Sequence, residues 1–278
     1  MSKTRIIAKI EVKDHQVVKG IRMEGLRVLG SPSYFAKKYY YEGIDEIIYH
    51  DVLASLLGRN VILNLIKETA SNIHIPLTVS GGIKKLKDIY DILSHGADRV
   101  ALNSAVFKNP EIIKKAVKEF GSSTIINNLD VGIKNEKYYL FTENGKNLRK
   151  INFIDWIKKI QDFGVGEFMV NTIHKDGTMD GFDLKLLEIL DKVIKIPFVF
   201  GGGFGKKEHL LNLYNSSKNV NGVVLSSALH YNNLDKNYNN NYGNIDFLKS
   251  KLEKKKLENI SIKKLKIFLI KNKILCRP

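Results

Sequence analysis

The chain repeats itself, because short apolar segments of its first half recur in the same order in its second half. Each copy lies about 120 residues after the original, and a fixed period of this kind indicates a duplicated structural unit. The pairs are Ile10–Val12 with Leu129–Val131, Gly43–Glu46 with Gly164–Glu167, Leu77–Ile83 with Phe198–Phe204, and Val100–Ala105 with Val223–Ala228. Continuous apolar runs of this length are typical of strands buried on both faces of a sheet.

Helical patterns separate these predicted strands. Residues Asn109–Glu111 supply an N-cap, a proline and an acidic side chain for a first turn, and Gly121 ends the apolar helix that follows. The segment 154–164 repeats the scheme. Strands that alternate with helices form a parallel sheet, and eight such units close into a barrel. We therefore predict an α/β fold, a single (βα)8 TIM barrel over residues 1–278 with an internal two-fold half-barrel repeat. An open doubly wound sheet is the alternative, and the two equal halves argue against it.

Two segments interrupt the repeat. Tyr138–Thr142 alternates in polarity and is followed by Asn144-Gly145, which predicts a small hairpin after the fifth strand. Residues 232–256 are rich in Asn and Lys and are expected to form a partly disordered insertion between the eighth strand and the last helix. That helix is amphipathic and is predicted near Ser261–Lys271.

Composition narrows the class of protein. Apolar residues make up 44% of the 278 residues and charged residues 27%, which is typical of a soluble globular chain. The sequence has no apolar run of about 18 residues that could span a membrane and no signal-peptide layout at its start. Its one cysteine, Cys276, excludes an intrachain disulfide, and we expect a cytoplasmic protein.

The net charge of +16 has three possible meanings. It could serve nucleic-acid binding or an anionic small substrate, or it could reflect lysines spread over solvated helix faces. The lysines occur throughout the chain, and no basic stripe is interleaved with aromatic residues. We therefore expect no nucleic-acid partner and no membrane partner.

Two acidic residues occupy equivalent positions in the repeat. Glu11 ends the first predicted strand and Asp130 ends the fifth. Active sites of such barrels lie at the C-terminal ends of the strands, where the first and fifth strands face each other. Either acid alone would more often be a solvated loop carboxylate. As an equivalent pair they suit a general acid and a general base, so we predict both as catalytic residues.

Glycine turns and small polar residues also occur twice. Glycines allow backbone N–H groups to approach an anion, and small side chains at a helix start complete a phosphate site. The predicted phosphate-binding residues are Gly81, Gly82, Asn103 and Ser104 in the first half, and Gly202, Gly203, Ser226 and Ser227 in the second. Two symmetric sites predict a small-molecule substrate that carries a phosphate at each end.

The opposite ends of the strands carry alternating charges. Arg5, Glu46, Arg99 and Glu167 each begin a predicted strand and would ring the barrel floor. Such a ring is more often a structural salt-bridge network, since the floor of these barrels usually serves stability. The seven histidines have no metal-ligand spacing and are interpreted as surface or packing residues, His50 among them. No metal and no cofactor are expected.

Together the motifs resemble the HisF family, the cyclase subunits of imidazole glycerol phosphate synthase. The resemblance covers about residues 3–231 and the last helix. It rests on Arg5–Ala8, Val12–Asp14, Val17–Gly20, Asp45-Glu46, Ala54-Ser55, Gly81–Ile83, Gly96–Asp98, Phe120–Ser122, Gly164–Glu167, Asp176–Thr178 and Gly181–Asp183.

The resemblance implies a reaction and a partner. Family members are lyases of histidine biosynthesis that close an imidazole ring on a phosphoribulosyl aminoimidazole carboxamide ribotide, using ammonia from a glutaminase. It implies a HisH-like glutaminase bound at the barrel floor, with Arg5, Glu46, Arg99 and Glu167 guarding ammonia entry. It also implies that Glu11 and Asp130 supply acid and base. Lys19 would lie in a mobile loop that closes over the substrate, and Asp176, Gly177 and Thr178 are implied as substrate-loop residues with it.

The chain also departs from the family pattern. It has Lys9, Glu11, Arg99, Asn171, His174 and Gly201 where the family has Cys, Asp, Lys, Thr, Asp and Ser. Lys9 is expected to lower the pKa of Glu11, and Glu11 carries its charge about 1 Å farther out, a shift that can matter greatly in catalysis. Glu11 and Lys9 favour one alternative to a cyclase, a HisF-like paralogue that delivers ammonia for sugar amidation in surface-glycan synthesis. Two further alternatives are a sister isomerase on the same fold, against which the barrel-floor charges argue, and a nucleic-acid binder, suggested by the net charge of +16.

Overall fold

The computed structural model describes residues 3–54, 62–234 and 260–277. Eight of the described strands are parallel and form a closed barrel, because β10 pairs both with β11 and with β7. These strands are β1 (Arg5–Lys13), β4 (Glu46–Asp51), β5 (Leu77–Ser80), β6 (Arg99–Leu102), β7 (Ile125–Lys134), β10 (Glu167–Thr172), β11 (Phe198–Gly201) and β12 (Val220–Leu225). The predicted (βα)8 barrel is confirmed, and the open sheet is wrong.

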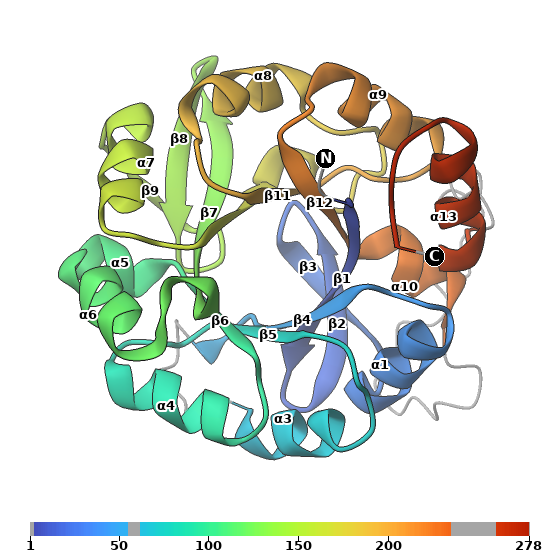
Figure 1. The fold of residues 1–278 in the computed structure, drawn as a ribbon, viewed down its shortest axis with the longest axis horizontal. Coiled ribbons are helices and arrows are strands. Elements are labelled where there is room, and N and C mark those ends of the chain that lie inside the picture. Colours follow the sequence, from blue (N-terminus) through green and yellow to red (C-terminus); the bar gives the residue numbers. More distant parts are fainter. Residues whose placement is uncertain (1–2, 55–61, 235–259, 278) are drawn as a thin grey trace.

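Helices surround the barrel, as Figure 1 shows in a view along its axis. They are α1 (Pro32–Tyr41), α3 (Leu63–Ala70), α4 (Leu86–Ser94), α5 (Ser104–Lys108), α6 (Glu111–Phe120), α7 (Phe153–Asp162), α8 (Leu184–Val193), α9 (Glu208–Ser216), α10 (Ser227–Asn232) and α13 (Ile262–Lys271). Polar side chains cap the N-termini of several of these helices. At the start of α7, for example, the Asn152 side chain accepts hydrogen bonds from the amides of Ile154 and Asp155.

Helix α6 begins differently from the prediction, whereas α13 matches it. Asn109 is not the N-cap of α6, because it ends the short helix α5 and Pro110 takes the cap position without a side-chain hydrogen bond. Helix α13 forms as predicted, with the Ser261 hydroxyl accepting from the amide of Lys264. The predicted Asn- and Lys-rich insertion falls on residues 232–256, and its part from 235 onward lies outside the described residues.

A β-hairpin extends from the top of each half of the barrel. Strands β8 (Lys137–Thr142) and β9 (Asn147–Arg149) continue from β7 and confirm the predicted hairpin. Strands β2 (Gln16–Ile21) and β3 (Glu24–Gly30) continue from β1 in the same way. No pattern in the sequence predicted this second hairpin. Both hairpins follow the strands that carry the two candidate catalytic acids.

The apolar core has two layers. The larger one lies between the strands and the surrounding helices and includes Ile6, Ala8 and Ile10 of β1. The smaller one fills the barrel and consists of Ile7, Ile48, Ala101, Ile126, Met169, Val199 and Val224. Because successive side chains of a strand point to opposite faces, alternate residues of each strand face the interior. No helix in the described parts of the chain is long and apolar enough to cross a membrane.

Candidate active site

Strand β1 supplies side chains at three levels of the barrel interior. Ile7 belongs to the interior apolar layer, so the alternation along β1 also turns Arg5, Lys9 and Glu11 inward. Arg5 lies at the floor, and Lys9 and Glu11 lie toward the mouth. Strand β7 contributes Asp130 by the same rule, since Ile126 is in the interior layer. In the barrel order β1 and β7 are four strands apart in either direction, so the two acids come from opposite walls as predicted.

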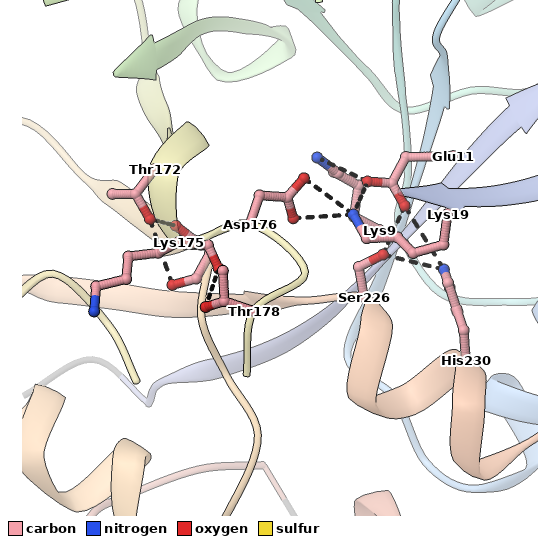
Figure 2. Close-up of polar contacts among 11 residues, drawn as sticks. Lys9, Glu11, Lys19, Thr172, Lys175, Asp176, Thr178, Ser226 and His230 are labelled. Atoms are coloured by element: carbon pink, nitrogen blue, oxygen red, sulfur yellow. Dashed lines mark hydrogen bonds and ion pairs between the residues drawn. The ribbon is translucent and has the colours of Figure 1, made fainter. Parts of the chain in front are cut away.

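Glu11 is enclosed by an ion-pair cluster, shown in Figure 2. Its Oε1 atom lies 2.5 Å from Nζ of Lys19 and 3.3 Å from Nζ of Lys9. Its Oε2 atom accepts a hydrogen bond of 2.6 Å from the Ser226 hydroxyl. Lys19 also reaches Asp176, with 2.9 Å between Nζ and Oδ1. We call Lys9, Glu11, Lys19 and Asp176 the buried ion cluster.

The cluster fixes the charge of Glu11. Burial alone would raise the pKa of Glu11, but the charges of Lys19 and Lys9 outweigh it and hold the pKa well below its ordinary value of 4.5. The effect of Lys9 has the direction expected from the sequence. Burial would likewise lower the pKa of Lys19, but Asp176 and Glu11 raise it. Both groups are therefore ionised at neutral pH.

His230 lies beside this cluster and is neutral. Burial lowers its pKa to about 4, even though the charge of Glu11 acts in the other direction. Its Nδ1 atom is 2.6 Å from the Tyr39 hydroxyl and its Nε2 atom 3.2 Å from the Ser226 hydroxyl. His230 therefore holds Ser226 in position to donate to Glu11.

Asp130 has a different environment from Glu11. Its carboxylate accepts from the side-chain amides of Asn103 at 2.8 Å and Asn128 at 3.3 Å. Burial raises the pKa of Asp130, and the charge of Lys9 and the neighbouring amides offset this only in part. Two acids whose surroundings move their pKa values in opposite directions are typical of a site in which the acids have separate roles.

The first cavity lies at the mouth of the first half-barrel. It has a volume of about 170 Å³ and is lined by the predicted residues Gly81, Gly82, Asn103 and Ser104 together with Asp130. Gly81 and Gly82 have positive φ values of 97° and 73°, a conformation that other residues rarely adopt. A Cβ atom at Gly81 would collide with the carbonyl oxygen of Asp51. This turn therefore requires glycine, and a glycine without a Cβ atom allows the backbone N–H groups to approach a ligand closely.

The second cavity lies at the equivalent place in the other half. It is lined by the predicted residues Gly202, Gly203, Ser226, Ser227, Asp176 and Gly177, and its volume is about 20 Å³. Lys9 and Asn171 also line it. Thr178 is close in sequence, and its hydroxyl donates to the carbonyl oxygen of Lys175 at 2.9 Å. The two predicted phosphate sites thus correspond to two cavities of unequal size.

The floor residues form a closed ring. Arg5 pairs with Glu46 at 3.0 Å and with Glu167, and Arg99 pairs with Glu46 at 3.6 Å and with Glu167. Burial raises the pKa of Glu46, and the charges of Arg5 and Arg99 oppose this. The Nε atom of Arg99 also donates to the carbonyl oxygen of Ser123 at 3.0 Å. The ring lies next to the interior apolar layer, because Ile7 and Ile48 are two residues farther along β1 and β4 than Arg5 and Glu46.

Two sequence-based assignments differ from the structure. Lys19 lies in strand β2 and is 1% exposed, whereas a mobile loop was expected. Lys19 is held there by the pairing of β2 with β1 and β3 and by its buried contacts to Glu11 and Asp176.

His50, interpreted as a surface or packing residue, lines the first cavity, where its Nδ1 atom is 2.7 Å from the Ser80 hydroxyl. The alternation Glu46, Ile48, His50 along β4 was the signal that could have found it.

His174 contacts Asp183, the residue that caps helix α8. Its Nε2 atom is 2.8 Å from Asp183, whose carboxylate also accepts from the amide of Leu186 and begins helix α8. The Tyr138 hydroxyl, on hairpin strand β8, donates to the same carboxylate at 3.0 Å. Within the described residues, no group of three or more His, Cys, Asp or Glu side chains is arranged to hold a metal ion.

Comparison with known proteins agrees with this architecture. Residues 5–235 match the model of a family described as histidine biosynthesis protein, so the chain belongs to that family. It is similar to the imidazole glycerol phosphate synthase subunit HisF of Legionella pneumophila, with 39% identity over 75% of this chain and 99% of the relative. The proteins of the same name from Staphylococcus saprophyticus and Sulfolobus acidocaldarius are 39% and 40% identical, over 83% and 77% of this chain and 92% and 86% of the relatives.

Proposed function

We propose that this chain is the cyclase subunit of a glutamine-dependent imidazole glycerol phosphate synthase, a lyase of histidine biosynthesis. It would convert a phosphoribulosyl formimino aminoimidazole carboxamide ribotide and ammonia into imidazole glycerol phosphate, aminoimidazole carboxamide ribotide and water. It would do so as a single barrel domain in the cytoplasm, the compartment expected for a chain with one cysteine.

One observation carries this proposal: glycine turns with small polar side chains line a cavity in each half of the barrel. Backbone N–H groups at such turns suit phosphate, and the duplication suits a ligand with a phosphate at each end. The predicted phosphate-binding residues would hold the two ends. The reacting centre would then lie between the walls that carry Glu11 and Asp130.

The two acids would have separate roles. Burial raises the pKa of Asp130, which favours a group that exchanges a proton with substrate. Glu11 is ionised and surrounded by cations, so it would hold negative charge near the substrate and orient Lys9 and Lys19. Lys19 would hold Asp176 in place at the second cavity, and Gly177 and Thr178 would continue the segment that borders the second phosphate.

The floor ring supports a role for a partner. The relatives are named as subunits, and a HisH-like glutaminase bound at the barrel floor would complete the enzyme. Ammonia released there would pass Arg5, Glu46, Arg99 and Glu167 and then the interior apolar layer. The ion pairs of Glu46 with Arg5 and Arg99, with N–O distances of 3.0 and 3.6 Å, would have to separate briefly for ammonia to pass.

A direct assay tests the proposal. The purified chain should cyclise the ribotide in the presence of an ammonium salt, and the product can be followed by chromatography. The gene, expressed with its own glutaminase, should also restore growth without histidine to a strain that lacks its cyclase. Soluble protein that does neither would contradict the proposal.

One observation favours a second candidate function. In this chain the carboxylate of Glu11 is already engaged by Lys19, Lys9 and Ser226. A HisF-like paralogue that delivers ammonia for sugar amidation in surface-glycan synthesis would keep the floor ring without needing a free acid at this position. Such a protein would fail to rescue the histidine auxotroph, and it would restore glycan amidation in a strain that lacks this gene.

A further inference from the structure

His50 occupies a level of strand β4 that faces the mouth of the barrel. Along β4, Glu46 belongs to the floor ring, Ile48 to the interior apolar layer, and His50 comes two residues later. In the sheet, His50 is level with Glu11 on β1 and with Ser80 on β5. The imidazole therefore lies on the same side of the sheet as the candidate catalytic acids.

The first cavity brings His50 and Asp130 together. Both side chains line it, and they come from strands that β5 and β6 separate. Asn103 and Asn128, which donate to Asp130, line the same cavity. A ligand whose phosphate reaches Gly81 and Gly82 would therefore extend past both His50 and Asp130.

Neighbouring groups fix the ring of His50. Nδ1 is 2.7 Å from the Ser80 hydroxyl, and Ser80 is 1% exposed. A Ser80 hydroxyl that donates to Nδ1 leaves the ring proton on Nε2. The side chain of Asn144, at the turn between β8 and β9, is a further hydrogen-bonding neighbour of the ring and also lines the cavity.

The ring is also neutral at physiological pH. Burial and the charge of Lys9 lower the pKa of His50 to about 4. A neutral imidazole has one N–H donor and keeps it over a wide pH range. Such a donor can polarise a substrate oxygen without adding a cation to the site, a role that neutral histidines fill in other enzymes.

We propose that His50 contacts the ligand bound in the first cavity and donates a hydrogen bond from Nε2 to an oxygen of its reacting centre. The ligand is a phosphorylated sugar-like chain with hydroxyl or carbonyl oxygens, and this assignment rests on the proposed function. Asn144 yields its place at the ring to the ligand. Glu11 cannot take this role, because its ionised carboxylate has no proton to donate and its two oxygens accept from Lys19, Lys9 and Ser226.

Kinetics of the ammonia-dependent reaction test the role in catalysis. Loss of one preorganised donor typically lowers kcat by about 100-fold or more. We expect His50→Leu to show such a loss in kcat, while KM changes less than about threefold. His50→Gln keeps an N–H donor, so its kcat should be at least about tenfold higher than that of His50→Leu. His74→Gln makes the same change at an exposed histidine and should match the wild type. A folded His50→Leu variant with wild-type kcat would overturn the proposal.

A binding measurement on the wild-type chain separates this proposal from the proposed function. We would label the histidine side chains and the glycine amides with ¹⁵N, assign His50 through His50→Gln, and titrate with ribose 5-phosphate. The Gly82 amide and the His50 ring should respond with the same saturation, whereas inorganic phosphate should move the Gly82 amide and leave the His50 ring nearly unchanged.

The possible outcomes are distinct. A His50 response in a protein that does not cyclise the ribotide would support His50 as a ligand contact and contradict the proposed function. Cyclisation by a protein whose His50 ring ignores ribose 5-phosphate, while Gly82 responds, would overturn the His50 proposal alone. A protein in which neither group responds would overturn the assignment of the cavity and with it the role of His50.

Discussion

Lys19 and Glu11 form a buried ion pair between neighbouring strands, with Nζ of Lys19 2.5 Å from Oε1 of Glu11. The Lys19 side chain is 1% exposed and that of Glu11 6%. The same ammonium group binds Asp176, from the segment after β10, and thereby fastens hairpin β2–β3 to the other half of the barrel. The backbone repeats this link, because the amide of Arg22 donates to the carbonyl oxygen of Asp176 at 2.7 Å.

Replacing Lys19 should destabilise the fold strongly. Lys19→Met removes the cation and leaves two carboxylates buried, of which Glu11 keeps Lys9 at 3.3 Å. Breaking a buried ion pair in this way typically costs about 3–5 kcal/mol. Unfolding in urea, followed by circular dichroism, would measure the loss. Lys37→Met, on the exposed side of α1, is the matched control and should change stability by less than about 0.5 kcal/mol. Equal midpoints for the two variants would contradict the role of Lys19.

The same pair should make stability depend on pH in the acid range. The folded state lowers the pKa of Glu11 below its ordinary value of 4.5, so the unfolded chain binds the proton more tightly. The stabilisation from Glu11 is therefore complete above pH 4.5 and is lost as the pH falls toward the lowered pKa of the folded state.

Lys19→Met isolates this contribution from those of other carboxylates. Lys19 is the first-listed cation that lowers the pKa of Glu11 against the effect of burial, so without it this pKa rises and the contribution of Glu11 to stability becomes smaller. Between about pH 5 and pH 3 the midpoint of thermal unfolding should therefore fall more steeply for the wild type than for the variant. Parallel curves over this range would show that Glu11 is not held ionised by Lys19.

Patterns local in the sequence predicted the barrel but missed one hairpin. Hairpin β8–β9 was found because Asn144-Gly145 marks its turn, where both residues have positive φ. The turn between β2 and β3 is built from Arg22 and Met23, whose φ values are 54° and 64°. Neither residue type signals a left-handed backbone, so the sequence offered no turn to recognise.

The candidate site shows the same limit. Glu11 and Asp130 could be matched through the repeat, and the glycine turns were recognisable by composition. The contact between Lys19 and Asp176 spans 157 residues and follows from barrel closure, which no local pattern encodes. His50 was missed for another reason: a search for metal-ligand spacing ignores a single histidine, whereas the two-residue period of β4 turns it toward the cavity.

Gly82 should be essential for binding an anion in the first cavity. A Cβ atom at Gly82 would lie 2.5 Å from Cβ of Ala54, and the φ of 73° disfavours other residues. We expect Gly82→Ala to weaken the binding of inorganic phosphate by at least about tenfold, because the turn must shift by more than a hydrogen bond tolerates. Isothermal titration calorimetry would measure the affinities.

Gly25→Ala is the matched control for this change. Gly25 also has a positive φ, of 62°, but an added Cβ atom would meet nothing within 4 Å. It lies in β3 and does not line the first cavity. The control should lose stability of the order of 1 kcal/mol from backbone strain and bind phosphate as the wild type does. Similar affinities for the two variants would mean that the Gly81-Gly82 turn does not bind the anion.

Asp130 should be needed for turnover but not for folding. Asp130→Asn keeps the shape of the side chain and one oxygen that can accept from Asn103 or Asn128, but it removes the exchangeable proton. Because burial raises the pKa of Asp130, the proposed role is proton transfer, and its loss should lower kcat of the ammonia-dependent reaction by about 100- to 10,000-fold. Asp162→Asn, at the exposed end of α7, should leave kcat unchanged. If Asp130→Asn folded with the melting temperature of the wild type and turned over at the same rate, proton transfer would have to be assigned to another group in the first cavity.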